Sequence, residues 1–431
     1  MPGTPPMAER APRLLLVPAF LGGHGGLENH VLSYARIAAR AGYDVSVVTP
    51  RPIPPDSELG PLLAQWAEVD DAERHWRATP VGRVVRAAAG AKALVEQRRP
   101  LTPERRATLA LDQARPYLDT YWQGDGRDTL GGADLVQAFG KPKAFVTNAI
   151  RAASESGIPV AYTEIAQVTV EYATRPDLVG FRDVADRCDH VLVMAESQGD
   201  DVRERFGYRG PVTVVEQWAD GLEADLLAIE RAGTATAERG PVQIGSLCRL
   251  SGEKGLDTLL EAFAQVAAAR PEARLEVAGT GDLGGMLRAL ARRLGVEDRV
   301  AFRGFVEDRT AFYRSVDLFA VCSIEEGGPI TGVEAMAAGL PLVTTPCGAM
   351  PDRVRDGVEG LRVAVGDVAG TAAALDRLVG DPALRHALGR AARHRYLERN
   401  TEAANERCLL GLWQTMRAGA RPEAAETGAP A

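Results

Sequence analysis

Two glutamates, Glu326 and Glu334, stand eight positions apart and bracket a glycine-rich turn at 327–329. The apolar run 317–322 before the turn predicts a buried strand, and the run 331–338 after it predicts a helix that ends at a glycine. A tight turn from strand to helix leaves free backbone N–H groups at the helix start, where anions bind. Carboxylates accept hydrogen bonds from hydroxyl groups. The pattern therefore favours a phosphate site with sugar or ribose hydroxyls on both sides, although either glutamate alone is equally well explained as a solvated surface residue.

A second loop carries two cations. The expected strand 244–247 runs into Arg249-Leu250-Ser251-Gly252-Glu253-Lys254-Gly255. The planar guanidinium of Arg249 and the mobile ammonium of Lys254 both suit a diphosphate. Two surface cations before a helix would explain this loop equally well on its own. Because parallel strands place their carboxyl ends at one edge of a sheet, we expect this loop to face the same crevice as Glu326.

Length and composition indicate a two-domain protein of the globular class. The chain has 431 residues, a net charge of −8 and 25% charged residues, with a pI of about 5.5. This acidic balance argues against a general binder of nucleic acid. The five cysteines include no Cys-x-x-Cys pair, which predicts reduced thiols in a cytoplasm and no zinc site. No apolar run reaches the length of a membrane span, and the run 14–21 fits a first buried strand better than a signal peptide.

The order of predicted elements indicates two doubly wound α/β domains. A strand at 13–20, a glycine loop, a helix at 27–41 and a strand at 44–49 begin the first domain. The same alternation resumes at 134 and, after a glycine-containing connection at 217–240, starts again at 242. We expect an N-terminal domain over 12–220, a C-terminal domain over 221–400, and a helix at 401–418 that returns to the N-terminal domain.

Residues 51–130 do not repeat this alternation. Helices are expected around 81–97 and 103–118. Between Asp71 and Arg106 there are nine Lys or Arg residues against four acids. This excess could bind an anionic acceptor or rest on a membrane surface, but charge runs are more often the solvated face of a helix.

The glutamate pair, followed by Ala-Met-Ala-Ala-Gly-x-Pro-Leu-Val, resembles the signature of the family 4 retaining glycosyltransferases, which have the GT-B fold of two Rossmann-like domains facing a cleft. The resemblance is strong over 241–400 and looser over 13–220. The cationic loop is similar to the family's Arg-x-x-x-x-Lys-Gly loop. Gly25-Gly26-Leu27-Glu28 is similar to its Gly-Gly-x-Glu loop, and Arg303-Gly304-Phe305-Val306 to the loop that holds the nucleotide base.

The resemblance implies a hexosyltransferase that uses a nucleoside-diphosphate sugar and an unidentified acceptor. The cysteines indicate a cytoplasmic protein, and the richness in Ala, Arg, Gly and Asp indicates a bacterial source. The chain has no Asp-x-Asp triplet of the kind that holds a metal in other glycosyltransferases, so we expect no obligatory metal or other cofactor, and its acidic charge predicts no nucleic-acid partner. The catalytic residues would be Glu326, Arg249 and Lys254. The donor would contact Glu334, Gly328, Ile330, Thr331, Phe305, Val306 and Gly279. On the acceptor side, the implied residues are Gly25, Gly26, His24 and Glu164.

Some features depart from the family pattern and leave alternatives open. Ile165 stands where the family has a histidine near the transferred sugar, and Gly327-Gly328-Pro329 replaces the commoner Gly-Phe-Gly. A non-catalytic nucleotide-sugar-binding homologue and a nucleotide-sugar epimerase therefore remain as rival functions. Residues 279–284 also have the Gly-x-Gly-x-x-Gly form of a dinucleotide site. That reading needs an acid at the end of the next strand, where this chain has Arg303.

Overall fold

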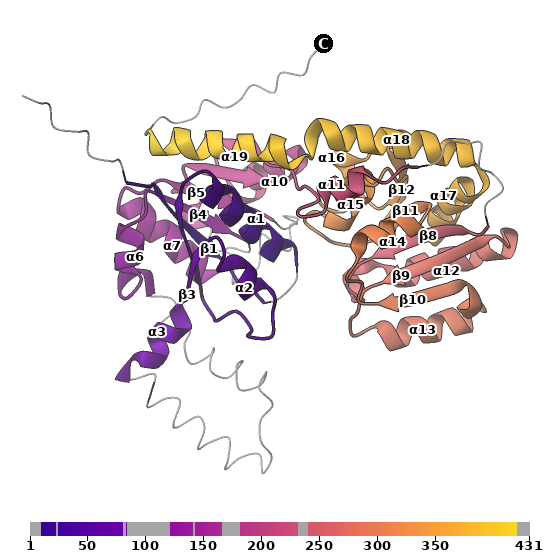
Figure 1. Ribbon diagram of the computed structural model, residues 1–431, viewed down its shortest axis with the longest axis horizontal. Coiled ribbons are helices and arrows are strands. Elements are labelled where there is room, and N and C mark those ends of the chain that lie inside the picture. The colour runs from indigo at the N-terminus through magenta and orange to yellow at the C-terminus, as the bar shows by residue number, and fades with distance from the viewer. Residues whose placement is uncertain are drawn as a thin grey trace, which may run out of the picture.

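A computed structural model describes residues 10–22, 25–80, 83, 121–140, 143–165, 182–231 and 240–419. The chain forms two α/β domains that lie side by side, each built on a parallel sheet with helices on both faces (Figure 1). The predicted fold class is confirmed. None of the described helices is both long and apolar enough to cross a bilayer.

The N-terminal domain contains a seven-stranded sheet in the order β3-β2-β1-β4-β5-β6-β7, parallel at every pairing. Its strands are β1 Arg13–Pro18, β2 Asp44–Thr49, β3 Glu68–Asp71, β4 Leu135–Phe139, β5 Val160–Thr163, β6 His190–Val193 and β7 Val212–Val214. Its helical segments are α1 Gly26–Arg40, α2 Leu59–Leu63, α3 Ala72–Ala78, η1 Tyr121–Gln123, α6 Arg127–Gly131, α7 Ala144–Glu155, α9 Arg182–Ala185 and α10 Glu196–Phe206. Strand β1 is continuously apolar because both of its faces are buried, with Leu15 and Val17 in one core and Leu14 and Leu16 in the other.

The C-terminal domain contains a six-stranded parallel sheet in the order β10-β9-β8-β11-β12-β13. Its strands are β8 Val242–Leu247, β9 Ala273–Ala278, β10 Val300–Gly304, β11 Leu318–Val321, β12 Leu342–Thr344 and β13 Gly360–Arg362. Its helical segments are α11 Glu223–Leu227, η4 Gly252–Lys254, α12 Leu256–Ala269, α13 Gly284–Arg293, η5 Glu297–Arg299, α14 Arg309–Ser315, α15 Ile330–Ala337, α16 Met350–Arg353, α17 Val368–Gly380 and α18 Pro382–Arg399. Strands β8 and β11 are neighbours in the sheet, so the loops that follow them lie at the same edge.

Two parts of the chain differ from the sequence predictions. The segment 51–130, where no βα unit was expected, contains strand β3 and helix α3, which extend the sheet beyond β2. The connection 217–240, expected as linker, contains α11, whose Leu226 is buried against the C-terminal domain. The predicted helices at 81–97 and 103–118, and most of the basic run 71–106, lie outside the described residues.

A final helix, α19 Glu402–Arg417, crosses from one domain to the other. Helices α18 and α19 follow one another along one side of the molecule, with α18 over the C-terminal domain and α19 over the N-terminal domain (Figure 1). Leu409 and Trp413 of α19 are fully buried in the core that includes Leu14 and Leu16 of β1. The indole Nε1 of Trp413 also donates to Gln137 Oε1 of β4 at 3.2 Å. The chain thus passes between the domains twice.

Candidate functional site

Lys254 and Glu326 meet at the carboxyl edge of the C-terminal sheet. Lys254 ends η4, after β8, and Glu326 lies in the loop after β11. Lys254 Nζ is 2.9 Å from Glu326 Oε1, and both side chains are mostly buried, with exposures of 14% and 18%. The Ser323 hydroxyl donates to the same carboxylate oxygen at 2.5 Å. The site therefore holds a cation and a carboxylate together at the position where the sequence predicts a diphosphate and a sugar.

Glycines allow the loops around this pair to approach one another. Gly255 has φ +60°, and a Cβ there would lie 2.1 Å from the carbonyl oxygen of Cys322, at the end of β11. Gly279 has φ +120°, and a Cβ there would lie 1.9 Å from the carbonyl oxygen of Cys248. Only glycine fits at both positions. These contacts explain the glycines at 255 and 279 as packing requirements of the loops, whichever ligand binds.

The glycine turn before α15 is held from several sides. The carbonyl oxygen of Gly327 accepts hydrogen bonds from the Gln198 side-chain amide at 2.6 Å and from the backbone N–H of Ala349 at 2.9 Å. Helix α15 begins at Ile330, with Thr331 in its first turn. The free N–H groups at this end of the helix lie next to the turn and give it a positive electrostatic potential.

Glu334 points into a buried polar cluster. Its side chain is 1% exposed, with Oε1 2.5 Å from Arg309 Nη1 and Oε2 2.7 Å from the Tyr313 hydroxyl. Burial raises the pKa of Glu334, and the charge of Arg309 and the Tyr313 hydrogen bond act in the opposite direction. Each carboxylate oxygen can accept two hydrogen bonds, so both oxygens retain the capacity to accept one more. Glu334 and Ile330 also line a cavity of about 20 Å³ beside His30 of α1, which is enough for one water molecule.

The other predicted donor residues are spread along the same edge. Arg249 is exposed and forms no ion pair with any residue in the described part of the chain. Phe305, after β10, is 65% exposed, whereas Val306 packs against the core beneath α14 and α15. Arg303 of β10 is paired with Glu276 of β9, with Nη2 2.9 Å from Oε1. The position where a dinucleotide site would need an acid is thus occupied by a paired arginine. Within the described ranges, no group of three or more His, Cys, Asp or Glu side chains is arranged to hold a metal ion.

The acceptor-side residues lie in the N-terminal domain. Gly25 and Gly26 begin α1, and a carboxylate oxygen of Glu28 accepts from the backbone N–H of Gly22 at 3.0 Å, which closes this loop. Glu164 is fully buried and its Oε2 lies 2.9 Å from the Tyr162 hydroxyl. His24 lies outside the described residues. Ile165, in the position of the family histidine, packs against Met194, Ala195 and Ala349.

Several polar residues of the site were not predicted. Ser323, Arg309 and Tyr313 contact the two glutamates, and Gln198 reaches the glycine turn from the other domain. Arg309 and Tyr313 are four positions apart in the sequence and so share one face of α14, but this spacing by itself does not indicate a carboxylate partner. A contact such as Gln198 with Gly327 leaves no local pattern in the sequence.

Comparisons with known proteins identify a family match in the C-terminal domain and curated relatives that match part of the chain. Residues 234–395 match the sequence model of the family described as Glycosyl transferases group 1. The chain is 36% identical over 180 residues to the lipopolysaccharide core biosynthesis glycosyltransferase LpsE of Rhizobium meliloti, a match that covers 42% of this chain and 51% of LpsE. It is 30% identical over 210 residues to glycogen synthase of Mycobacterium tuberculosis, covering 48% of this chain and 49% of that protein. The matches thus span about half the length of these relatives.

Solved structures resemble the whole molecule. The crystal structure of Anabaena HepE in complex with UDP superimposes with a TM-score of 0.69 at 19% identity, covering 94% of this chain and 100% of that one. Sucrose-phosphate synthase from Thermosynechococcus elongatus gives a TM-score of 0.70 at 19% identity, covering 95% and 100%. At this identity the likeness concerns the fold. The chain therefore has the GT-B fold, and its residues 234–395 match the glycosyl transferases group 1.

Proposed function

We propose that this protein is a glycosyltransferase that moves a hexosyl group from a nucleoside-diphosphate sugar to an acceptor, with retention of the anomeric configuration. The observation that carries the proposal is the Lys254–Glu326 pair beside the glycine turn and the start of α15. A diphosphate needs cations and backbone N–H donors, and a sugar needs carboxylate acceptors. This edge of the sheet supplies both. The match of residues 234–395 to a glycosyltransferase family supports the same reading.

In this mechanism, negative charge develops on the departing diphosphate. Lys254, Arg249 and the N–H groups at the start of α15 stabilise that charge. No obligatory metal is needed, because these groups provide the positive potential. Glu326 binds sugar hydroxyls, and the departing phosphate takes the acceptor proton on the same face of the sugar. The acceptor binds in the N-terminal domain, near Gly25 and Gly26, where α1 begins.

The identity of the base is also a proposal. Anabaena HepE, which has a similar fold, has been solved in complex with UDP and with UDP-glucose, so uridine is the first candidate for this chain. A cytoplasmic location is expected because all five cysteines are free thiols, as in proteins of reducing compartments.

The proposal is tested by incubating the purified protein with UDP-, GDP- and ADP-activated hexoses and measuring release of the nucleoside diphosphate. We expect release from one base class only, with or without EDTA. Binding of a nucleoside diphosphate without any turnover would favour the non-catalytic homologue. Conversion of the donor to its epimer without release would favour the epimerase. No binding of any nucleotide would contradict the proposed donor site.

A further inference from the structure

The chain connects the domains at two segments, a first crossing around Glu216 and Gln217 and a second crossing around Asn400, and these form one buried junction. Asn400 donates from Nδ2 to Glu216 Oε2 at 2.9 Å and to the carbonyl oxygen of Gln217 at 2.8 Å. Arg399 Nε lies 3.0 Å from Glu216 Oε1. Glu216, Gln217 and Asn400 are all buried. Side chains of the second crossing thus fix the first crossing in place.

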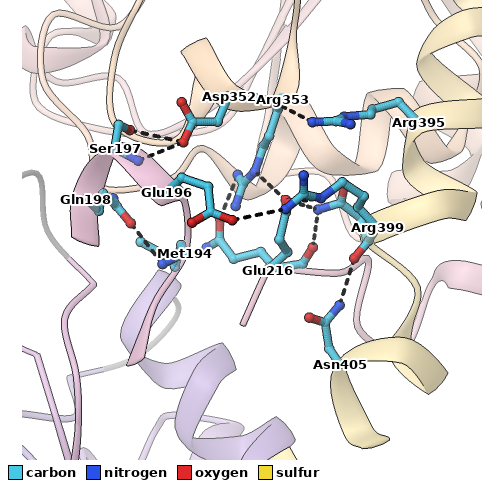
Figure 2. A network of polar contacts seen from close by, with 12 residues as sticks. Met194, Glu196, Ser197, Gln198, Glu216, Asp352, Arg353, Arg395, Arg399 and Asn405 are labelled. Carbon is cyan, nitrogen blue, oxygen red and sulfur yellow. Dashed lines mark hydrogen bonds and ion pairs between the residues drawn. The ribbon is translucent and has the colours of Figure 1, made fainter. Parts of the chain in front are cut away.

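Arg353 is the last residue of α16. Its buried guanidinium points towards Glu216 at this junction (Figure 2). It is 1% exposed, and its Nη1 donates to Gln217 Oε1 at 3.0 Å. Its Nε is 3.5 Å from Glu216 Oε2, which is too long for a good hydrogen bond. Among the residues that the structure describes, Nε and Nη2 have no hydrogen-bond partner. A buried charge with unused donors is unusual because its desolvation is unfavourable.

Gln217 connects this arginine to the glycine turn of the candidate site. A Cβ on Gly328 would lie 2.4 Å from Gln217 Oε1 and 3.3 Å from Arg353 Nη1. The turn therefore rests directly on the side chain that Arg353 holds. The carbonyl oxygen of the neighbouring Gly327 accepts a hydrogen bond from Gln198 of the N-terminal domain. Both domains and the crossing between them consequently meet at these two glycines.

We propose that Arg353 is a positioning residue for the turn at Gly327–Gly328. By holding Gln217, it fixes this turn relative to the two crossings between the domains. The inference rests on the proposed function, which assigns the turn to the donor diphosphate. Arg353 acts on the turn through Gln217 and does not touch the substrate. Losing this link should impair turnover more than donor binding, because Lys254 and the start of α15 remain in place.

The test uses the full-length protein with Arg353→Met and Gln217→Met, singly and together. Hydrogen exchange of the peptide that spans 326–332 is measured without ligand, and kcat and KM are measured with the best donor of the screen. We expect faster exchange in both single variants and a kcat lowered roughly tenfold, with KM changed by less than about threefold. The double variant should be no worse than the single ones, because both break the same link.

Gln217→Met introduces no uncompensated charge and keeps the test valid if Arg353→Met does not fold. Two further variants, Arg362→Met and Arg353→Lys, make the result specific. Arg362→Met removes an exposed arginine of the same domain and should leave both exchange and kcat unchanged. Arg353→Lys keeps the positive charge and hydrogen-bond donors at this position, and should have a higher kcat than Arg353→Met.

Unchanged exchange in Gln217→Met, or a double variant that shows the product of the two single losses in kcat, would overturn the proposal. The exchange experiment contains no donor, so its outcome does not depend on the proposed activity. If the wild-type protein shows no turnover but the 326–332 peptide still exchanges faster in both variants than in wild type, the proposed function is contradicted. The proposed link between Arg353 and the turn then still holds.

Discussion

One oxygen of Glu326 is shared between Lys254 and Ser323. Its other oxygen, Oε2, accepts no hydrogen bond from the described residues and is available to a sugar hydroxyl. A nucleophilic carboxylate would need a free oxygen beneath the anomeric carbon, whereas this one lies beside the turn proposed for the diphosphate. The position of Glu326 beside the turn, rather than its contacts, is therefore why we propose that it binds the sugar and is not the nucleophile.

Replacing Glu326 by Gln tests that role. The amide has nearly the same shape but loses the charge that pairs with Lys254 and accepts from hydroxyls. We expect kcat to fall by the equivalent of about 1.5–3 kcal/mol, the range for a hydrogen bond to a charged group, with weaker discrimination between donor sugars and nucleotide affinity largely kept. Glu325→Gln, at the exposed neighbouring position, is the control. A glycosyl group trapped on Glu326 in a mass spectrum would overturn this assignment.

The two cations should differ when each is replaced by Ala. Both Arg249→Ala and Lys254→Ala should lower kcat more than they change the thermal midpoint, because negative charge grows on the leaving phosphate in the transition state. Lys254→Ala should have the larger effect, since it also leaves Glu326 without its cation. Steady-state kinetics check both variants. Activity within a few-fold of wild type for both variants would refute the assignment, and loss of activity in EDTA that magnesium restores would refute the metal-independent mechanism.

Glu334 is assigned to the ribose. Glu334→Gln should weaken nucleoside-diphosphate binding by roughly 1.5–3 kcal/mol. It should also lower stability, because Arg309 loses its buried counter-charge. Calorimetry with the nucleotide separates these effects, since binding is measured on the folded variant. Unchanged affinity would place Glu334 outside the donor site and leave it a structural partner of Arg309 and Tyr313.

Among the strands, β1, which is buried on both faces, could be predicted, whereas β3, at one edge of the N-terminal sheet, could not. Strand β1 is apolar at almost every position, and its Leu14–Val17 segment indicates a central strand directly. Strand β3, Glu-Val-Asp-Asp, has three acids in four residues. It is placed by its pairing with β2, and nothing in its own composition predicts a strand. Helix α11 is equally short and is defined by the burial of Leu226 in the C-terminal domain.

A buried histidine between β6 and β7 predicts how the free energy of unfolding depends on pH. His190 of β6 is buried, with Nε2 2.6 Å from Thr213 Oγ1 of β7, and burial lowers its pKa to about 4. The unfolded chain binds the proton near pH 6.5, so this group destabilises the fold as the pH falls from 6.5 towards 4 and has no effect above that window. By pH 4.5 the free energy of unfolding should be lower by roughly 2–3 kcal/mol than at pH 7 because of this group.

The measurement is urea denaturation of the full-length protein at pH 7 and pH 4.5, for wild type and His190→Gln. The variant should lose less stability between the two pH values than wild type does. His394→Gln, whose side chain is 74% exposed, should behave like wild type. An equal loss in wild type and His190→Gln would show that His190 takes up no proton on unfolding in this range.

At the scale of the molecule, the arrangement of two Rossmann-like domains follows from the order of elements and from the family resemblance. The contacts that join the domains do not. Gln198 meets Gly327 across 129 positions, and Arg353 meets Gln217 across 136. Buried polar contacts of this kind depend on how two finished domains pack, so no local periodicity or propensity encodes them. The sequence could indicate the edge that carries the chemistry, but not the residues that brace it.

The stereochemistry of transfer tests the central claim most directly. UDP-glucose, an α-configured donor, is incubated with the protein and water as the acceptor, and the anomeric proton of the released glucose is followed by NMR before mutarotation equilibrates it. The same experiment is run with another base if the donor screen selects one. The account predicts that α-glucose is released first, with an equal amount of nucleoside diphosphate. Initial release of β-glucose would contradict a retaining transfer at the Lys254–Glu326 site.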